Sequence, residues 1–356
     1  MSTNELPKAT SQYTLHDQKG FQSLKLEHDV PIPALGDYDC LVQIQAVSLN
    51  YRDLIIATGD YPFPVKLPRV PCSDGAGNVL AVGSRVTEFE VGDKVCTLFN
   101  QGHQAGPMCP EYLQTGLGGA VDGTLRQYGV FPASGLVAAP TNLTPDEAGT
   151  LTCAPVTAWN ALYGLESKAL KPGQCVLTQG TGGVSIAAIQ FALAAGAIVI
   201  ATSSSDEKCK YLEEKLGAQH TINYKSTPNW GETAKKLSPN GEGVDHVVEI
   251  GGPNTMEQSM QAIKMEGVIS VIGFVGGQPG EKQPSTLDAL THVCTIRGLM
   301  VGSRLQFQDM NKAIDAHNIK PIISETFPFE KAQEAFQYVW DQKHTGKAVI
   351  QLGRLQ

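Results

Sequence analysis

Short apolar runs separated by turn-forming residues dominate the first third of the chain. Apolar and polar positions alternate over residues 40–49, 77–86, 92–99 and 125–132, and glycine, proline or aspartate stands between the runs. Strands at such turn-bounded spacing are typical of a compact, mostly antiparallel, barrel-like domain. The segment between Phe99 and Leu125 is rich in glycine and proline, which predicts a long surface loop of the kind that often covers a site.

The pattern changes after about Asp146, where helical spacing gives way to apolar strands that alternate with amphipathic helices. This alternation indicates βαβ units and a parallel sheet covered on both faces. The chain then ends in an amphipathic helix, a turn and a strand. We therefore predict an α/β protein with a barrel-like, mostly-β domain at 1–155 and 300–356, and a doubly wound domain at 156–299.

Length and charge narrow the class of protein. A chain of 356 residues exceeds the usual limit of one hydrophobic core, which agrees with two domains. The net charge of -8 argues against nucleic acid or an anionic membrane as a partner. The polar N-terminal segment through Gln18 lacks the apolar core of a signal peptide, so we expect a cytoplasmic protein with a small-molecule substrate.

The eight cysteines are scattered, and none stands in C-x-x-C spacing. Such a distribution indicates neither a disulfide framework nor a zinc ribbon. Most of these cysteines lie in apolar runs, so we expect them to be small buried side chains.

A glycine-rich turn between an apolar strand and an apolar helix predicts a dinucleotide site. Glycines at this position let the backbone approach a pyrophosphate, and the amides at the start of the helix favour its negative charge. Ser185 stands where the common motif has its third glycine. The alternative is an ordinary glycine turn. The residues expected to contact the nucleotide are Gly180, Thr181, Gly182, Gly183 and Val184.

The end of the next strand favours NADP(H) over NAD. An NAD site usually has a carboxylate there to accept hydrogen bonds from the ribose 2′-hydroxyl. This chain instead has Ser203 and Ser204, followed by Lys208, which together could hold a 2′-phosphate. The alternative is helix capping by the serines and a solvated helix face for Lys208.

Five further segments resemble motifs of the medium-chain dehydrogenase/reductase superfamily, which includes zinc alcohol dehydrogenases, quinone oxidoreductases and enoyl reductases. The resemblance runs nearly end to end, is strongest to the quinone-oxidoreductase-like, zinc-free branch, and implies a GroES-like catalytic domain with a Rossmann cofactor domain. The segments are Val47–Asp53, Pro71–Gly77, Val91–Val95, Cys153–Trp159 and Gly346–Ile350.

The same resemblance implies that the chain holds no zinc. Zinc-dependent members use a cysteine, a histidine and a second cysteine, but the first two positions here are Asn50 and Ser73, and only Cys153 matches. A rearranged metal site built from Cys72, Asp74 and Cys153 is the alternative.

Without a metal, hydrogen-bond donors must stabilise the charge that develops on the substrate. The resemblance places Asn50, Tyr51 and Asp53 at the substrate pocket. Asn50 and Tyr51 are the candidates for binding and protonating the substrate oxygen, and Asp53 is the candidate for orienting them. A packed aromatic ring with its hydroxyl in water is the alternative for Tyr51.

The resemblance also implies contacts to the nicotinamide from Thr157 and from the main chain near Phe274 and Val275. It places Tyr224 near the adenosine phosphate and Lys347 at the cofactor or in the cleft between the domains. For Tyr224 the alternative is an aromatic side chain that covers the end of the sheet.

A strand near residues 293–302 pairs across a two-fold axis in relatives, so we expect a homodimer, with a monomer as the alternative.

The predicted function is transfer of hydride from NADPH to a quinone or an activated C=C. Two alternatives stay open: zinc-independent interconversion of alcohols with aldehydes or ketones, and a sensor that binds NADPH without turnover.

Overall fold

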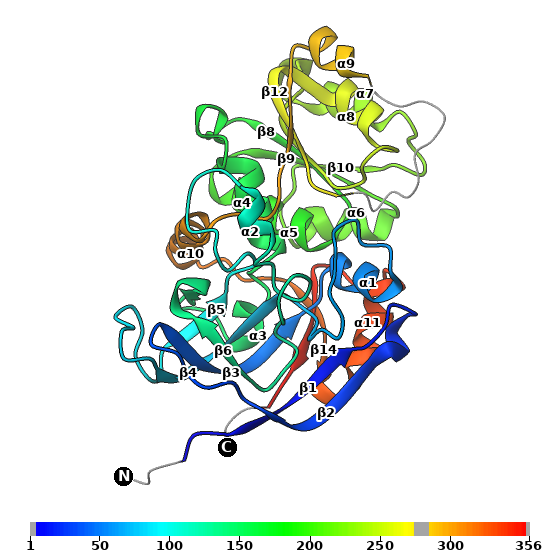
Figure 1. Cartoon of the computed structure of the whole chain (residues 1–356). Helices are drawn as coiled ribbons and strands as arrows, with labels where there is room; N and C mark the ends of the chain where they lie inside the picture. Colours follow the sequence, from blue (N-terminus) through cyan, green and yellow to red (C-terminus); the bar gives the residue numbers. More distant parts are fainter. Residues whose placement is uncertain (1–4, 274–284, 354–356) are drawn as a thin grey trace. The chain divides into compact units, whose positions relative to one another are not determined.

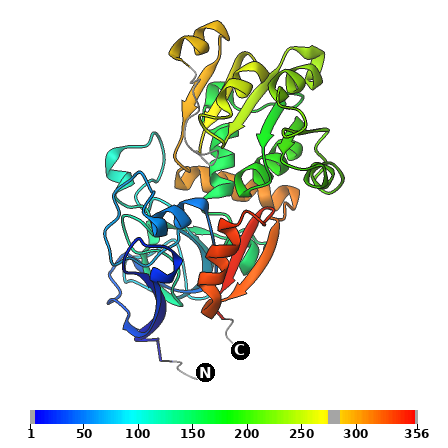
Figure 2. The ribbon, with the colours of Figure 1, turned by 90° about the vertical axis from the view of Figure 1, so that its right-hand side faces the viewer.

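The computed structural model describes residues 5–273 and 285–353, so the predicted nicotinamide contacts at Phe274 and Val275 lie outside the described residues. Two compact units divide the chain, one formed by Met1–Val156 with Ser303–Gln356 and the other by Thr157–Gly302. The C-terminal strands, red in Figures 1 and 2, belong to the same unit as the blue N-terminal strands.

The first unit is built on a seven-stranded sheet in the order β14-β15-β3-β4-β5-β7, with β6 paired to β3. All these pairs are antiparallel except β14 with β15. The strands are β3 (Asp39–Ser48), β4 (Asp74–Val82), β5 (Lys94–Thr97), β6 (Tyr128–Pro132), β7 (Leu136–Ala138), β14 (Ile323–Pro328) and β15 (Lys347–Gln351), and a separate hairpin joins β1 (Ala9–Leu15) to β2 (Leu24–Pro31). The predicted mostly antiparallel β domain is confirmed.

Close backbone packing explains the glycine at position 77 of the first unit. Gly77 on β4 pairs with Ile44 on β3, and a Cβ at Gly77 would lie 1.9 Å from the carbonyl oxygen of Gln43. Only a residue without a side chain fits this crossing.

Short helices complete the first unit. The helices are α1 (Tyr51–Thr58), α2 (Pro110–Leu113), α3 (Pro145–Ala148), α10 (Arg304–His317) and α11 (Ala332–Trp340). The buried core contains Leu54 of α1 and Phe336 of α11 together with Ile44, Leu125 and Ile350.

The expectation of a long surface loop between Phe99 and Leu125 is confirmed only in part, because both ends of the segment are buried. Phe99, Leu117 and Leu125 are buried, and a bridge pairs Asn100 with Gly116. Only the middle of the segment, around α2, is exposed. Glycine and proline content marked irregular backbone here, but irregular backbone can still be buried when its polar groups are paired.

The second unit is a six-stranded parallel sheet in the order β10-β9-β8-β11-β12-β13. Its strands are β8 (Cys175–Gln179), β9 (Ile198–Ser203), β10 (His220–Asn223), β11 (Val244–Glu249), β12 (Ile263–Val271) and β13 (Thr295–Gly298), and its helices are α4 (Ala154–Tyr163), α5 (Gly183–Ala194), α6 (Asp206–Glu214), α7 (Trp230–Leu237), α8 (Met256–Ala262) and α9 (Thr286–Thr291). The predicted doubly wound domain is confirmed. The strand order reverses between β8 and β11, and ligands bind at such a switch point in open parallel sheets.

Among the residues that the structure describes, no helix combines the length and the apolar character that a membrane span needs.

Candidate functional site

The glycine-rich turn leaves β8 at the switch point and enters α5 at Gly183. Gly180 has a φ of 73°, in the left-handed region. A Cβ at Gly180 or Gly182 would meet no other atom within 4 Å, so protein packing does not demand a glycine at either position. Thr181 is buried, whereas Val184 in the first turn of α5 is half-buried. The open backbone and the unpaired first-turn amides of a helix fit a pyrophosphate.

The serine in place of the third glycine has a physical reason. Ser185 is completely buried, and its Oγ donates a hydrogen bond to the carbonyl oxygen of Gln179 at 2.5 Å. This bond fixes the first turn of α5 against the end of β8. A small polar side chain therefore replaces glycine without moving the helix away from the sheet.

The residues predicted to hold a 2′-phosphate gather at the carboxyl ends of β9 and β10. Ser203 ends β9, and its carbonyl oxygen accepts from the backbone N–H of Tyr224 at 3.0 Å. Ser204 and Lys208 are half-buried, and the Tyr224 side chain is 40% exposed. The helix cap is Ser205, whose Oγ accepts from the backbone N–H of Lys208 at 3.3 Å. Capping thus occupies Ser205, a different serine from the two predicted ligands.

Sequence reasoning missed Lys225, which follows Tyr224 and is exposed at the same end of the sheet. Its position after a predicted ligand was the available signal. Asp206 and Glu207 at the start of α6 are exposed nearby, and Asp206 accepts a hydrogen bond from Asn223 Nδ2 at 2.7 Å.

A second group that sequence reasoning missed lies across the switch point from the glycine turn. Glu249 ends β11 and is fully buried. Its carboxylate accepts from Gln179 Nε2 at 2.7 Å, from the backbone N–H of Gly251 and of Gly252 at 2.9 Å each, and from Ser259 Oγ. These bonds fix the turn after β11 and tie it to the end of β8. A lone Glu at the end of an apolar strand was the only signal.

In the first unit, the predicted catalytic residues surround the start of α1. The carboxylate of Asp53 accepts from the backbone N–H of Asn50 at 2.9 Å and from Arg52 Nη1 at 3.2 Å. Arg52 Nη1 also donates to the carbonyl oxygen of Leu117 at 2.9 Å. Tyr51 is 37% exposed and starts the helix. The contacts of Asp53 are those of a residue that orients its neighbours.

Burial raises the pKa of Asp53 to about 6, and the nearby carboxylate of Asp74 adds to the rise. The positive charges of Arg52 and Lys347 and the hydrogen bond from Asn50 oppose it. Removal from water is the largest cause, so the charged carboxylate is held less favourably than it would be in water.

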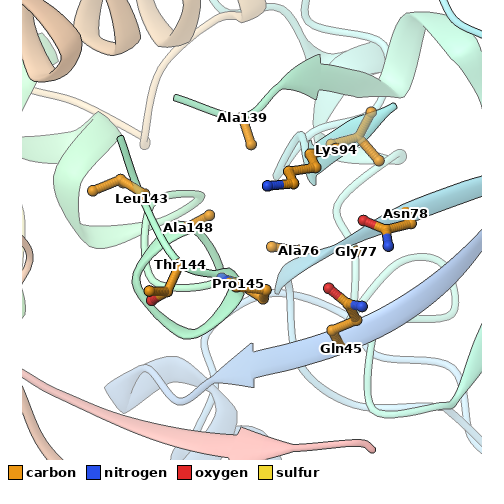
Figure 3. Close-up of a pocket in the computed structure, with 11 residues that line it drawn as sticks. Gln45, Ala76, Gly77, Asn78, Lys94, Ala139, Leu143, Thr144, Pro145 and Ala148 are labelled. Atoms are coloured by element: carbon orange, nitrogen blue, oxygen red, sulfur yellow. The ribbon is translucent and has the colours of Figure 1, made fainter. Parts of the chain in front are cut away.

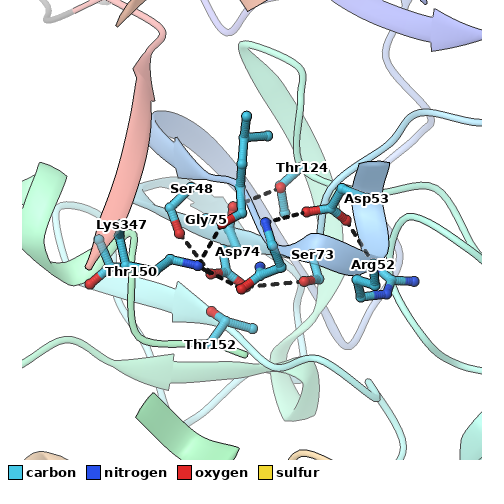
Figure 4. A network of polar contacts seen from close by, with 12 residues as sticks. Ser48, Arg52, Asp53, Ser73, Asp74, Gly75, Thr124, Thr150, Thr152 and Lys347 are labelled. Atoms are coloured by element: carbon cyan, nitrogen blue, oxygen red, sulfur yellow. Dashed lines mark hydrogen bonds and ion pairs between the residues drawn. The ribbon is translucent and has the colours of Figure 1, made fainter. Parts of the chain in front are cut away.

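Lys347 corrects our expectation of a cofactor contact. Its side chain is 5% exposed, and Nζ donates to the carbonyl oxygen of Leu49 at 2.8 Å, to Asn50 Oδ1 at 2.6 Å and to Asp74 Oδ2 at 3.2 Å. Figure 4 shows the ammonium directed at Asp74. A lysine has three N–H donors, and all three have acceptors here within the first unit.

The carboxylate of Asp74 is held on several sides. Ser48 Oγ donates to Oδ2 at 2.7 Å, and Ser73 Oγ donates to Oδ1 at 3.0 Å. Thr124 Oγ1 donates to the backbone carbonyl of Asp74 at 2.8 Å. Asp74 has no exposed surface, so Lys347, Asp74 and Asn50 form a buried network that we call the Lys347 network.

The residues at the zinc positions of relatives do not fit the metal. Asn50 and Ser73 supply no imidazole or thiol, and no group of three or more His, Cys, Asp or Glu side chains in the described part of the chain could hold a metal ion. Burial raises the pKa of the Cys153 thiol to about 12 and that of the Cys72 thiol well above its usual range.

A small hollow elsewhere in the first unit does not belong to this site. Gly77, Lys94 and Ala139 line it beside α3, as Figure 3 shows, and none of the predicted catalytic residues does.

Thr157, predicted to contact the nicotinamide, is buried in α4.

Comparison with known proteins decides the family. A family model described as an alcohol dehydrogenase GroES-like domain matches residues 36–141, and one described as a zinc-binding dehydrogenase matches residues 183–316. A zinc-type alcohol dehydrogenase-like protein of Schizosaccharomyces pombe is 46% identical over 345 residues, which cover 96% of this chain and 99% of that protein. The chain belongs to the medium-chain dehydrogenase/reductase superfamily. It is an oxidoreductase of the alcohol dehydrogenase type, for which a pyridine nucleotide is the cofactor.

Solved structures of other superfamily members superpose on this one. An NAD-dependent alcohol dehydrogenase has a TM-score of 0.85 and 29% identity, with 96% of this chain and 100% of that chain covered. A crotonyl-CoA carboxylase/reductase has a TM-score of 0.87 and 26% identity, with coverage of 98% and 89%. The expected superfamily and two-domain α/β fold are confirmed.

Proposed function

We propose that this protein is an NADPH-dependent, zinc-independent oxidoreductase that reduces a quinone or an activated C=C. The observation that carries the proposal is the Lys347 network, because it places a buried cation against Asn50, the residue at the first zinc position of relatives.

The preference for NADPH rests on the carboxyl end of β9. That end carries Ser203 and Ser204 instead of a carboxylate; Lys208 lies in α6, which follows β9, and Lys225 lies just after the neighbouring strand β10. A 2′-phosphate carries nearly two negative charges, which favour hydroxyl and ammonium donors over a carboxylate acceptor. Tyr224, exposed beside Ser203, offers a face for the adenine end of the nucleotide.

Charge and ligand chemistry support the proposal that the protein works without zinc. A second cation next to the Lys347 ammonium in a buried region would be strongly repelled. Zinc also requires deprotonated thiols or neutral imidazoles, and only Cys153 of the usual set is present.

When bound, NADPH supplies a hydride to the electron-poor carbon of the substrate. The protein then has to stabilise the negative charge that appears on the substrate oxygen and to allow a proton to reach the reduced product. The side-chain N–H₂ of Asn50 is a donor for that oxygen, and Tyr51, partly exposed at the start of α1, can deliver a proton from solvent. Asp53 holds the backbone of this turn.

Interconversion of alcohols with aldehydes or ketones is a second candidate function. The names of the S. pombe relative and of the NAD-dependent neighbour favour it. The crotonyl-CoA carboxylase/reductase, whose name describes a reductase of an enoyl thioester, favours the C=C reaction instead.

The test is NADPH oxidation by the purified protein with a quinone, an enone and an aldehyde, each assayed before and after treatment with a chelator. We expect turnover of the quinone or the enone, unchanged by the chelator. Turnover of the aldehyde alone would favour the second candidate. Loss of activity on chelation, restored by zinc, would overturn zinc independence, and tight NADPH binding without any turnover would favour a sensor.

We also propose a homodimer joined along β13. This strand is an edge of the parallel sheet, and the apolar side chains of Leu290, Val293 and Ile296 near it are exposed. An exposed apolar edge strand commonly finds a partner strand. Light scattering should give twice the chain mass for the wild type and the chain mass for Ile296→Lys; a monomeric wild type would contradict the proposal.

A further inference from the structure

In the side-chain amide of Asn50, the oxygen has a hydrogen-bond partner, whereas the nitrogen has none among the described residues. Its Oδ1 accepts from Lys347 Nζ at 2.6 Å, while Nδ2 is buried and has no hydrogen-bond partner among the described residues. The whole residue is 9% exposed. A buried donor without a partner destabilises the folded protein, so such a group in a native protein calls for a reason.

The ammonium of Lys347 determines which way this amide faces. Because an ammonium can only donate, the atom 2.6 Å from Nζ must be the carbonyl oxygen of Asn50 and not its nitrogen. The two N–H bonds of Nδ2 therefore point away from Lys347. Rotation of the amide by half a turn would place two donors against each other.

The rest of the network keeps Lys347 in this position. Its other two donors go to the carbonyl oxygen of Leu49 and to Asp74, and Ser48 and Ser73 hold that carboxylate in turn. Each acceptor around Nζ comes from a different backbone position, so the ammonium has little freedom to move.

We propose that Lys347 is a positioning residue: it locks the Asn50 amide with Nδ2 presented to the substrate oxygen and increases the acidity of that N–H₂ by polarising the amide from its oxygen. The inference rests on the proposed function and assigns Lys347 a role apart from the nucleotide. The substrates it favours carry a carbonyl-type oxygen that gains negative charge on reduction, as quinones and enones do.

Removal of Lys347 alone would leave Asp74 buried and unpaired, which could unfold the protein. The double variant Lys347→Met with Asp74→Asn removes both charges together and keeps the volumes close. Lys320→Met is the matched control, since Lys320 also donates to a backbone carbonyl in the first unit, that of Asn142, but makes none of the hydrogen bonds of the Lys347 network.

Kinetics with NADPH and an enone, 2-cyclohexen-1-one, form the first test. The double variant should keep its NADPH affinity within twofold, lose about 100-fold in kcat and change KM less than threefold, because loss of one oriented oxyanion donor has an effect of about this size. Asn50→Ala should lose a similar factor, and the triple variant should lose no more than Asn50→Ala alone. Multiplied losses in the triple variant, or more than a third of kcat retained in the double variant, would overturn the proposal.

A second readout does not depend on turnover, so it separates failure of this inference from failure of the proposed function. In protein labelled with 15N-asparagine, the Asn50 side-chain signal, identified by its absence in Asn50→Ala, should be a single rigid pair in the wild type and in Lys320→Met. It should shift and broaden in the double variant. An unchanged Asn50 signal in the double variant would contradict the lock even if the enzyme proved inactive on every substrate tried.

Discussion

The glycine turn of the second unit, where we propose that the nucleotide binds, and the Lys347 network of the first unit differ in how closely the protein packs around them. The glycine turn between β8 and α5 is open backbone, with no atom within 4 Å of where a Cβ at Gly182 would stand. The Lys347 network is closed side-chain chemistry, in which an ammonium and a carboxylate satisfy each other out of contact with water. The glycine turn thus leaves room for a charged group from outside the protein, whereas the Lys347 network holds its own charges in place and leaves only the Asn50 Nδ2 donor without a partner among the described residues.

Among the variants considered, Asp74→Asn in the Lys347 network should have the largest effect on stability. It leaves the Lys347 ammonium buried without its counter-charge, so the free energy of unfolding should fall by about 3–5 kcal/mol. Chemical denaturation measures this. The matched control is Asp309→Asn, which breaks the exposed ion pair with Lys312 and should change stability by about 0.5 kcal/mol or less. Equal effects of the two variants would show that the Lys347–Asp74 pair behaves as a surface pair.

A pair of glycine variants sharpens the comparison. Gly77→Ala inserts a Cβ against the Gln43 carbonyl and should lower the free energy of unfolding by about 3 kcal/mol. Gly182→Ala meets no protein atom, so stability should stay within about 0.5 kcal/mol while NADPH binds at least about tenfold more weakly. Stability would be followed by denaturation and binding by calorimetry. Normal NADPH binding by the Gly182→Ala protein would show that the pyrophosphate does not bind at this turn.

The glycine turn and the Lys347 network also differ in how well their residues could be predicted from the sequence. The positions of the glycine turn and of the serines at the end of β9 could be predicted, because they depend on residues adjacent in the chain and on strand and helix periodicity. The Lys347 network could not, because Leu49 follows β3, Asp74 starts β4 and Lys347 starts β15, and these three strands come together only through β-sheet pairing. Lys347 was therefore expected at the cofactor or in the cleft between the domains from its motif alone. Glu249 was missed for the same reason, since its partners follow two different strands.

Titration of Asp53 should give a pH-dependent difference in stability. The pKa of about 6 in the folded protein lies above the ordinary value of 3.8, so the folded state binds this proton more tightly than the unfolded state does. The stabilisation is complete below that ordinary value and is lost as the pH rises through about 6. Relative to Asp53→Asn, the wild type should therefore lose about 1–3 kcal/mol of unfolding free energy over this window. Parallel stability curves would contradict the raised pKa.

The smallest effect is expected on nucleotide binding, at the proposed 2′-phosphate site beside β9. Lys208→Ala should weaken NADPH binding about 10- to 100-fold, because one charge-assisted hydrogen bond is lost, and should leave NADH within about twofold. Lys210→Ala on the same helix, where the lysine pairs with Glu214, is the control and should affect neither nucleotide. If Lys208→Ala weakened both nucleotides equally, the 2′-phosphate would have to lie elsewhere.

The central claim is that this superfamily member binds NADPH at the switch point without help from a metal. Calorimetric titration of the chelator-treated wild type with NADPH and then with NADH tests it most directly. We expect one NADPH per chain, bound at least about tenfold more tightly than NADH, a difference of about 1.4 kcal/mol or more. No heat from either nucleotide, or tighter binding of NADH, would contradict the claim.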